Sequence, residues 1–345
     1  MYKHFRKGES IKILAWPKNG LNPYNEIIYT ELEKQGIEVL SHREHRSAGI
    51  FYKIDVFHFH WINAYLNHNP FKAFIATISF MLYIIILKIR GTKIVWTLHN
   101  SVKFTHHGKN KWLENILVPF LLHSVDTIII HSKFQKNHLD KKYHDKIVWI
   151  PHQNYCSILD ENIEKKNNYY LFFGGINYYK GIESAINAYN MLSDKLTSVM
   201  KFKIVGSVVE NDYVHKLNEL IGNNNNILLE DRFVEDDELE SLVKEAKSIL
   251  LPFTQITNSG SLLYALSCRT NVIMKKSILT DELHKEYENL DKVLFTFETE
   301  EELSNILKNN LIYDSSNFDD FIEKTNMSTL VSKYMEIIKW RKNEK

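Results

Sequence analysis

The chain has 345 residues, of which 44% are hydrophobic and 25% are charged, and its formal net charge is +1. This length suits two domains that each bury a core, and the near-neutral balance excludes a general electrostatic attraction to nucleic acid. Cys156 and Cys268 lie far apart and form no metal-binding spacing, which indicates a reducing compartment such as the cytoplasm.

The first sixteen residues are basic and pass into one short strand, without the apolar run and small-residue cleavage site of a signal peptide. We therefore expect an unprocessed N-terminus. Strands and helices then alternate up to about residue 150, which predicts a parallel sheet covered on both faces. The expected strands are 11–16, 37–40, 54–59, 93–98, 127–130 and 147–150, and the expected helices are 24–34, 71–89, 111–122 and 134–139.

The helix expected at residues 71–89 is strongly apolar. Its uncharged run, residues 73–87, is shorter than the roughly 20 residues that span a bilayer. Two interpretations remain open. The helix could be buried in the domain, or it could rest on a membrane surface with Lys72, Lys88 and Arg90 near the headgroups.

A polar stretch at residues 160–168 predicts a linker, and the alternation restarts after it. The predicted fold is α/β, with two Rossmann-like doubly wound domains that face each other across a cleft. The predicted boundaries are 1–158 and 169–326, and an amphipathic helix within 327–345 could pack back on the first domain.

Histidines follow several strands of the first domain. His58 and His60 alternate along one strand, so they lie on the same side of it. They could bind a metal, but no third ligand is visible, and a polar cluster is the preferred interpretation. A histidine just after a strand, such as His99, can hydrogen-bond a substrate hydroxyl or move a proton. The candidate acceptor-side residues are His60, Trp61, Asn100, His107, His152 and Asn154.

Two segments of the second domain carry a phosphate-binding pattern. Gly174 and Gly175 follow a strand and allow a ligand to approach the backbone, and Lys180 supplies a point charge at the expected start of a helix. Residues 258–261 form a second polar helix start after a strand, with free N–H groups and a positive dipole end. The predicted diphosphate cradle contains Gly174, Gly175, Lys180, Asn258, Ser259, Gly260 and Ser261. The alternative is that Asn258 or Ser259 merely caps the helix.

These motifs together resemble a GT-B glycosyltransferase of the bacterial family-4 type, which builds capsular and exopolysaccharide repeat units. Lys180 and Gly181 match the family's Lys-Gly pair, but Gly175 stands where the family has arginine. Residues 234–239 resemble the acidic helix start beside the nucleotide base, and residues 246–274 match the phosphate-binding unit without a gap. The family's two glutamates are replaced by Ile256 and Tyr264, which puts the ribose contact and the stereochemistry in doubt.

The resemblance implies transfer of a sugar, with retention, from a nucleoside diphosphate sugar to a hydroxyl of a lipid-linked or oligosaccharide acceptor. Lys180 would stabilise the leaving diphosphate together with the helix N-terminus, and no metal or other cofactor is expected. Phe233, Val234 and Tyr264 would bind the nucleoside, and His99 would lie near the reacting carbon of the sugar. The protein would be cytoplasmic, in peripheral contact with the inner face of the membrane.

Two other functions stay open. A sugar-nucleotide 2-epimerase shares the fold, but the resemblance would then require a carboxylate pair directly after Gly260, which is absent. A catalytically silent homologue that binds a nucleotide is favoured by the two missing glutamates.

Overall fold

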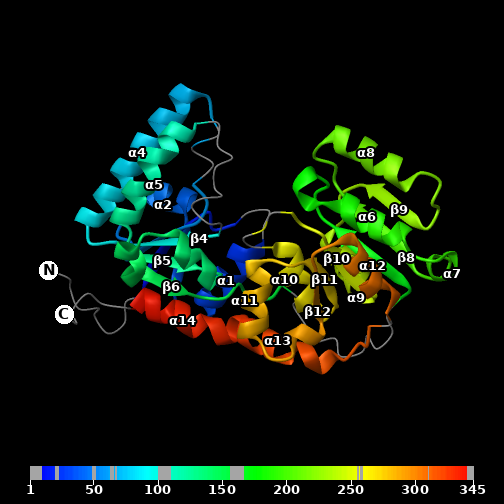
Figure 1. Ribbon diagram of the computed structural model, residues 1–345. Coiled ribbons are helices and arrows are strands. Elements are labelled where there is room, and N and C mark those ends of the chain that lie inside the picture. The colour runs from blue at the N-terminus through cyan, green and yellow to red at the C-terminus, as the bar shows by residue number, and fades with distance from the viewer. Residues whose placement is uncertain are drawn as a thin grey trace. The chain divides into compact units, whose positions relative to one another are not determined.

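The computed structural model divides into two compact units, which are described separately (Figure 1). The first contains Met1–Gln153 and Thr325–Lys345, and the second contains Asn154–Lys324. Three candidate residues, Asn100, His107 and Asn258, lie outside the described part. The residues described are 10–19, 23–48, 52–62, 66, 68–99, 110–155, 167–254, 256, 259–309 and 311–339.

The first unit is built on a six-stranded parallel sheet with the order β2-β1-β3-β4-β5-β6. Its strands are nearly continuous apolar runs, as expected of a sheet with both faces covered, and all four residues of β5 are buried. Because the strands are parallel, their carboxyl ends meet at one edge. The bounds are β1 Lys12–Trp16, β2 Glu38–Ser41, β3 Val56–Phe59, β4 Lys93–Leu98, β5 Thr127–Ile130 and β6 Ile147–Trp149.

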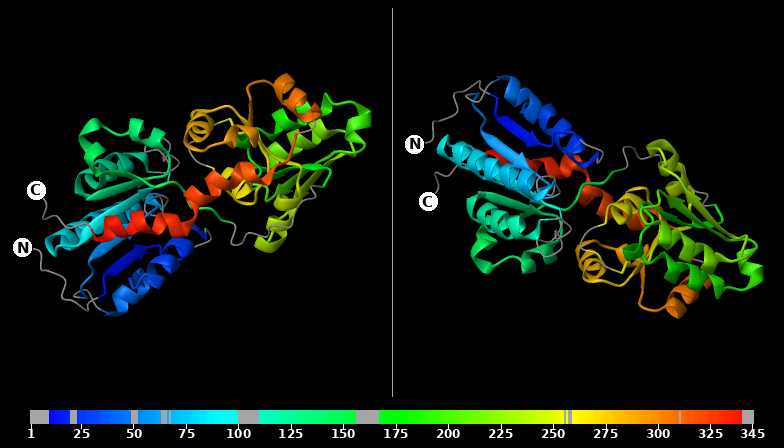
Figure 2. Two further views of the ribbon diagram at one scale, coloured as in Figure 1. Left: turned by 90° about the horizontal axis from the view of Figure 1, so that it is seen from below. Right: turned by 90° about the horizontal axis from the view of Figure 1, so that it is seen from above.

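The helices of the first unit include the last helix of the chain. The α14 helix packs against α1, and the hydroxyl groups of Tyr24 and Tyr334 lie 3.0 Å apart (Figure 2). The ammonium of Lys93 also donates a hydrogen bond to the carbonyl of Ile337. The terminal helix is therefore part of the first unit. The bounds are α1 Pro23–Lys34, α2 His42–Ala48, α4 Pro70–Ile89, α5 Lys111–Ser124, α14 Met327–Lys339 and the 3-10 turns η2 Lys133–His138 and η3 Lys141–Lys146.

The second unit has a six-stranded parallel sheet with the order β12-β11-β10-β7-β8-β9. The chain first builds outward from β7 through β8 to β9 and then returns to the other side of β7 through β10. This is the strand order of dinucleotide-binding domains, and its topological switch point lies between β7 and β10. The bounds are β7 Tyr169–Phe173, β8 Lys201–Gly206, β9 Ile227–Asp231, β10 Ser248–Leu251, β11 Val272–Lys275 and β12 Leu294–Phe297.

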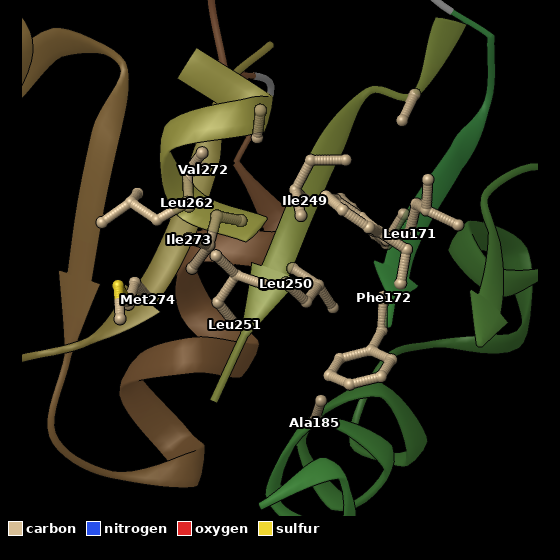
Figure 3. Packing of buried hydrophobic residues seen from close by; sticks show 14 of the residues in the cluster. Leu171, Phe172, Ala185, Ile249, Leu250, Leu251, Leu262, Val272, Ile273 and Met274 are labelled. Carbon is tan, nitrogen blue, oxygen red and sulfur yellow. The ribbon is translucent and has the colours of Figure 1, made fainter. Parts of the chain in front are cut away.

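The core of the second unit forms where β7, β10 and β11 lie side by side (Figure 3). Leu171 and Phe172 are fully buried beside Leu250 of β10, and Leu262 of α10 covers the same sheet. The two parallel doubly wound sheets confirm the predicted fold class. The helices are α6 Ile182–Asn190, α7 Asp194–Thr197, α8 Asn211–Ile221, α9 Asp236–Glu245, α10 Gly260–Ser267, α11 Ile278–Glu286, α12 Glu300–Lys308 and α13 Asp319–Thr325, with 3-10 turns η4 Tyr178–Lys180, η5 Leu290–Lys292 and η6 Ser315–Phe318.

Candidate functional site

The switch point of the second sheet is where ligands bind in folds of this type. The loop after β7 carries the glycine pair, and the loop after β10 leads into α10. Because β7 and β10 are hydrogen-bonded neighbours, both loops leave the sheet at the same edge. The two halves of the predicted diphosphate cradle therefore start from adjacent strands.

Close backbone approach explains the glycines of this edge. Gly174 has φ +110, which favours glycine, and a Cβ added to it would lie 3.6 Å from Oγ of Ser261. A Cβ on Gly206, at the end of β8, would lie 1.9 Å from the carbonyl oxygen of Gly174. The loop after β7 therefore lies near the start of α10. Separately, the end of β8 approaches the backbone of Gly174 so closely that position 206 requires glycine.

The sequence analysis expected Lys180 at the start of a helix, and this expectation is wrong. Lys180 is the last residue of η4. Gly181, with a φ of +60, is the N-cap of α6, which begins at the next residue. The turn is held against the loop after β10, because the backbone N–H and the hydroxyl of Thr254 both donate to the carbonyl of Tyr179 at 3.0 Å. A Cβ on Gly181 would also lie 2.4 Å from the carbonyl oxygen of Pro252. Glycine is required there to bring the two loops together.

The ammonium of Lys180 lies over the ring of Phe253, 3.8 Å from its centroid, and 5.0 Å from the centroid of Tyr179. Burial lowers the pKa of Lys180 to about 8. Within the described residues no carboxylate contributes to this shift, and Lys180 takes part in no ion pair. A largely desolvated cation with aromatic neighbours and no counter-ion is suited to an anionic ligand.

The N-terminus of α10 supplies the other side of the cradle. The hydroxyl of Ser259 accepts a hydrogen bond from the N–H of Leu262 at 3.1 Å, so this residue does cap the helix. The first N–H groups of a helix have no partner within it, and they favour an anion. A Cβ placed on Gly260 would meet nothing within 4 Å, so the helix start borders open space.

The candidate nucleoside residues are not all close to the cradle. Tyr264 lies on α10, half-buried, with its ring 5.9 Å from that of Phe173. Phe233 and Val234 follow β9, which is two strands away from β7. Phe233 is 71% exposed, whereas Val234 packs partly against the core. The structure thus places Tyr264 beside the cradle, and it gives Phe233 a solvent-facing position.

In the first unit, five histidines form a row along the carboxyl edge of the sheet. All five are buried, and they belong to four neighbouring strands. The ring of Tyr24 packs edge-on against four of them, with centroid distances of 4.6 to 5.7 Å. This histidine row consists of His58 in β3, His60 just after it, His99 after β4, His131 after β5 and His152 after β6.

Hydrogen bonds connect the row. The hydroxyl of Tyr29 lies 3.1 Å from Nδ1 of His58 and 2.7 Å from Nε2 of His60, which places both imidazoles on the same side of β3. Nδ1 of His60 lies 3.1 Å from Nε2 of His99. The ring of Trp61 stacks on His99 at 4.3 Å between centroids. His60, Trp61 and His99 are therefore brought together.

The histidine row is uncharged near neutral pH. Burial lowers the pKa of His58 to about 3 and that of His131 to about 4, and it also lowers the pKa of His60, His99 and His152. Neighbouring histidines add to the effect on His99, because two imidazolium groups would repel each other. Neutral imidazoles can accept a hydrogen bond from a hydroxyl, or bind a metal.

Three members of the row could hold a metal ion. One ring nitrogen from each of His99, His131 and His152 lies within 4.8 Å of the other two. Nδ1 of His131 lies 2.9 Å from the carbonyl oxygen of Ile150, while its buried Nε2 has no partner in the described part of the chain. A backbone anchor on the second nitrogen is typical of metal-binding histidines. The sequence analysis found no third ligand beside His58 and His60, and the trio that the structure brings together contains neither of these two residues. The expectation of no metal stays a prediction.

Sequence analysis missed several residues of these two edges. His131 stands directly after β5, as His99 does after β4, so a search for histidine at every strand end would have found it. Tyr24, Gly206 and Phe253 have no such signal, because only the packing of separate segments gives them their contacts. The predicted residue Asn154 is the first residue of the second unit.

Comparison with known proteins finds relatives in sequence and in fold. Residues 158–324 match the family model "Glycosyl transferases group 1". A GDP-mannose:glycolipid 4-beta-D-mannosyltransferase of Xanthomonas campestris pv. campestris is 25% identical over 266 residues, which cover 74% of this chain and 70% of that protein.

Among solved structures, the Anabaena protein Alr3699/HepE in complex with UDP is similar with a TM-score of 0.67 and 15% identity, covering 96% of this chain and 99% of that one. The avilamycin A biosynthesis glycosyltransferase AviGT4 is similar with a TM-score of 0.59 and 13% identity, covering 96% and 97%. The fold and the family match together indicate a GT-B glycosyltransferase, in which residues 158–324 match the group 1 glycosyl transferase model.

Proposed function

We propose that this glycosyltransferase moves a sugar from a nucleoside diphosphate sugar to a hydroxyl of a lipid-linked or oligosaccharide acceptor, in the synthesis of a cell-surface polysaccharide such as a capsule or exopolysaccharide. One observation carries the donor part of the proposal. Lys180 is a largely buried cation that pairs with no carboxylate among the described residues, and its turn is bound to the loop that leads into the N-terminus of α10. Alr3699/HepE, which shares the fold, was solved with UDP and with UDP-glucose.

In the reaction, the bond between the anomeric carbon and the β-phosphate oxygen breaks, and the acceptor oxygen forms a bond to that carbon. The leaving diphosphate gains negative charge in the transition state. Lys180 and the first N–H groups of α10 would stabilise that charge where it develops, which is the use of preorganised donors in enzymes. The proposal needs no divalent cation at the diphosphate.

We assign the acceptor hydroxyl to the edge that carries the histidine row. His99 is neutral, so one of its ring nitrogens can accept a hydrogen bond from the hydroxyl and orient it. Its lowered pKa makes it a weak base, and we expect orientation to contribute more than full proton removal. The proton of the acceptor hydroxyl passes to the leaving nucleoside diphosphate or to solvent.

The acceptor class rests on the mannosyltransferase relative, whose name specifies a glycolipid acceptor. A lipid-linked acceptor requires the enzyme to work beside a bilayer, so we propose a cytoplasmic protein that is peripheral on the inner face of the membrane. We keep retention of the anomeric configuration as the expected stereochemical course. NMR of the product, compared with the donor, decides it through the one-bond coupling constant between the anomeric carbon and its proton.

The test begins with binding. The chain is titrated with UDP, GDP and ADP by calorimetry, and the nucleotide that binds selects the sugar nucleotides for a turnover assay. Release of nucleoside diphosphate that depends on a lipid-linked or oligosaccharide acceptor supports the proposal. Conversion of the sugar nucleotide to an epimer without any acceptor would establish the epimerase instead, and nucleotide binding with no turnover on any donor would establish the silent homologue.

A further inference from the structure

The α4 helix exposes an apolar face to solvent. It is the one helix in the described part of the chain that is long and apolar enough to cross a membrane, yet only 28% of that apolar window is buried. The exposed side chains recur every three or four residues, so they lie along one side of the helix. They are Phe71, Phe74, Ile75, Ile78, Leu82, Ile85, Ile86 and Ile89, and their exposure ranges from 37% to 81%.

A second apolar stripe occupies the opposite side of the same helix. Ala73, Thr77, Phe80, Ile84 and Leu87 are buried, and Phe80 packs on Phe57 and Phe59 of β3. The helix is therefore bound along its length to the first sheet. A helix held in this way cannot have lipid on all sides, so α4 does not span a bilayer while the first unit is folded. If this helix contacts a membrane, it therefore lies in the plane of the interface, with its apolar outer face toward the acyl chains.

The apolar surface continues onto α5, which packs beside α4 (Figure 1). The rings of Phe74 and Trp112 stack, with centroids 6.2 Å apart, and Trp112 remains 49% exposed. Ile116, one turn further along α5, is 47% exposed. We call the exposed residues of α4 together with Trp112 and Ile116 the outer apolar face.

Most charges of the described residues around this face are positive, and the acidic Asp126 is paired with Lys88. Residues 70–89 contain no aspartate or glutamate, and the single acidic residue of α5, Glu114, is buried. Lys72, Arg90 and Lys111 are exposed at the ends of the two helices. Basic residues that flank an exposed apolar helix face match the headgroups of an anionic bilayer, and a tryptophan at the border is typical of membrane interfaces.

We infer that the outer apolar face docks this protein on the surface of an anionic phospholipid bilayer, with α4 and α5 parallel to the membrane plane. The apolar side chains enter the boundary between headgroups and acyl chains, and the lysines and arginine contact lipid phosphates. The inference rests on the proposed function in one respect: a lipid-linked acceptor gives the docked enzyme its substrate. The contact itself requires neither donor nor transfer.

The experiment measures flotation of the full chain with vesicles in a density gradient, without any nucleotide. Vesicles of phosphatidylcholine alone are compared with vesicles of phosphatidylcholine and phosphatidylglycerol at about 7:3. We expect flotation with the anionic vesicles, weaker flotation with the neutral ones, and a partial loss at high salt, because the apolar part of the contact is not screened.

Variants locate the contact. Replacing Ile75 and Leu82 together by Gln keeps helix propensity and is expected to weaken partition by about tenfold or more per residue. The matched control replaces Val199 and Ile312 by Gln in the same way. Both are exposed apolar residues of the second unit, and this variant is expected to float like the wild type. Circular dichroism and thermal unfolding verify that both variants fold.

Three outcomes would overturn the inference. The wild type could fail to float with anionic vesicles, the Ile75/Leu82 variant could float as well as the wild type, or the control pair could abolish flotation. A fourth outcome would reassign the face to contact between two copies of this chain: a dimer in lipid-free sedimentation that the Ile75/Leu82 variant dissociates. Because none of these readouts uses the donor site, they remain separate from a failure of the proposed transfer.

Discussion

Replacing Lys180 by Met is the sharpest test of the donor site. Methionine keeps an unbranched stem that can still lie on the ring of Phe253, and it removes only the charge. A hydrogen bond from a charged group to a phosphate contributes about 1.5–3 kcal/mol. We therefore expect the Kd for the preferred nucleoside diphosphate to rise about 13- to 160-fold, with turnover reduced at least as much, since the leaving group gains charge in the transition state.

The pH dependence gives the same test a second readout. Burial lowers the pKa of Lys180 to about 8, so the ammonium is lost as the pH rises through that value in the free protein. If only the charged form binds well, the Kd at one pH unit above this pKa is about tenfold weaker than at pH 7. The Lys180→Met variant has no such group, so its Kd is expected to be nearly independent of pH between about 7 and 9.

The assay is isothermal titration calorimetry with the wild type, the Lys180→Met variant and a matched control, Lys203→Met. Lys203 lies in β8 of the same unit, and its ammonium also stands over an aromatic ring, 4.0 Å from the centroid of Tyr169. The control is expected to bind like the wild type. Equal Kd values and equal pH profiles for the wild type and the Lys180→Met variant would remove Lys180 from the site and refute the reasoning from its burial.

Four further outcomes are expected. Gly181→Ala places a Cβ 2.4 Å from the carbonyl oxygen of Pro252 at a φ of +60, so it should lower the free energy of unfolding in urea by at least about 2 kcal/mol. The control Gly36→Ala, at a φ of +81, meets nothing within 4 Å and should lower it by only about 1 kcal/mol. Equal losses would show that the contact at Gly181 is not tight. His99→Ala should lower kcat about tenfold to 100-fold with little change in donor Kd, and the opposite pattern would make His99 a donor-binding residue. Tyr264→Phe should raise the donor Kd about 2- to 12-fold, and an unchanged value would mean that its hydroxyl does not contact the ribose. Chelation of divalent cations should leave the donor Kd unchanged, and a chelator-sensitive Kd would place a metal at the diphosphate.

Much of the fold follows from local patterns. The apolar runs of four or five residues and the helical spacings between them predict the elements of both sheets, because a strand buried on both faces has few polar positions. The bounds of α4, expected at 71–89 and observed at Pro70–Ile89, follow from a capping signal: Asn69 accepts a hydrogen bond from the N–H of Lys72, and Pro70 stands at the first helical position. What the same stretch exposes could not be predicted, since both of its sides are apolar and the sequence does not say which one the sheet covers.

The sequence by itself determined the alternation of strands and helices, the glycine and lysine pattern after β7, and the polar start of α10, because these depend on residues that are near one another along the chain. Only the tertiary structure decided that Gly206 must be glycine to admit Gly174, that the Lys180 ammonium lies over Phe253, and that histidines from four strands form a single row. Strand order brings these residues together, and it is set by long-range packing of the sheet, in which segments separated by tens of residues become neighbours.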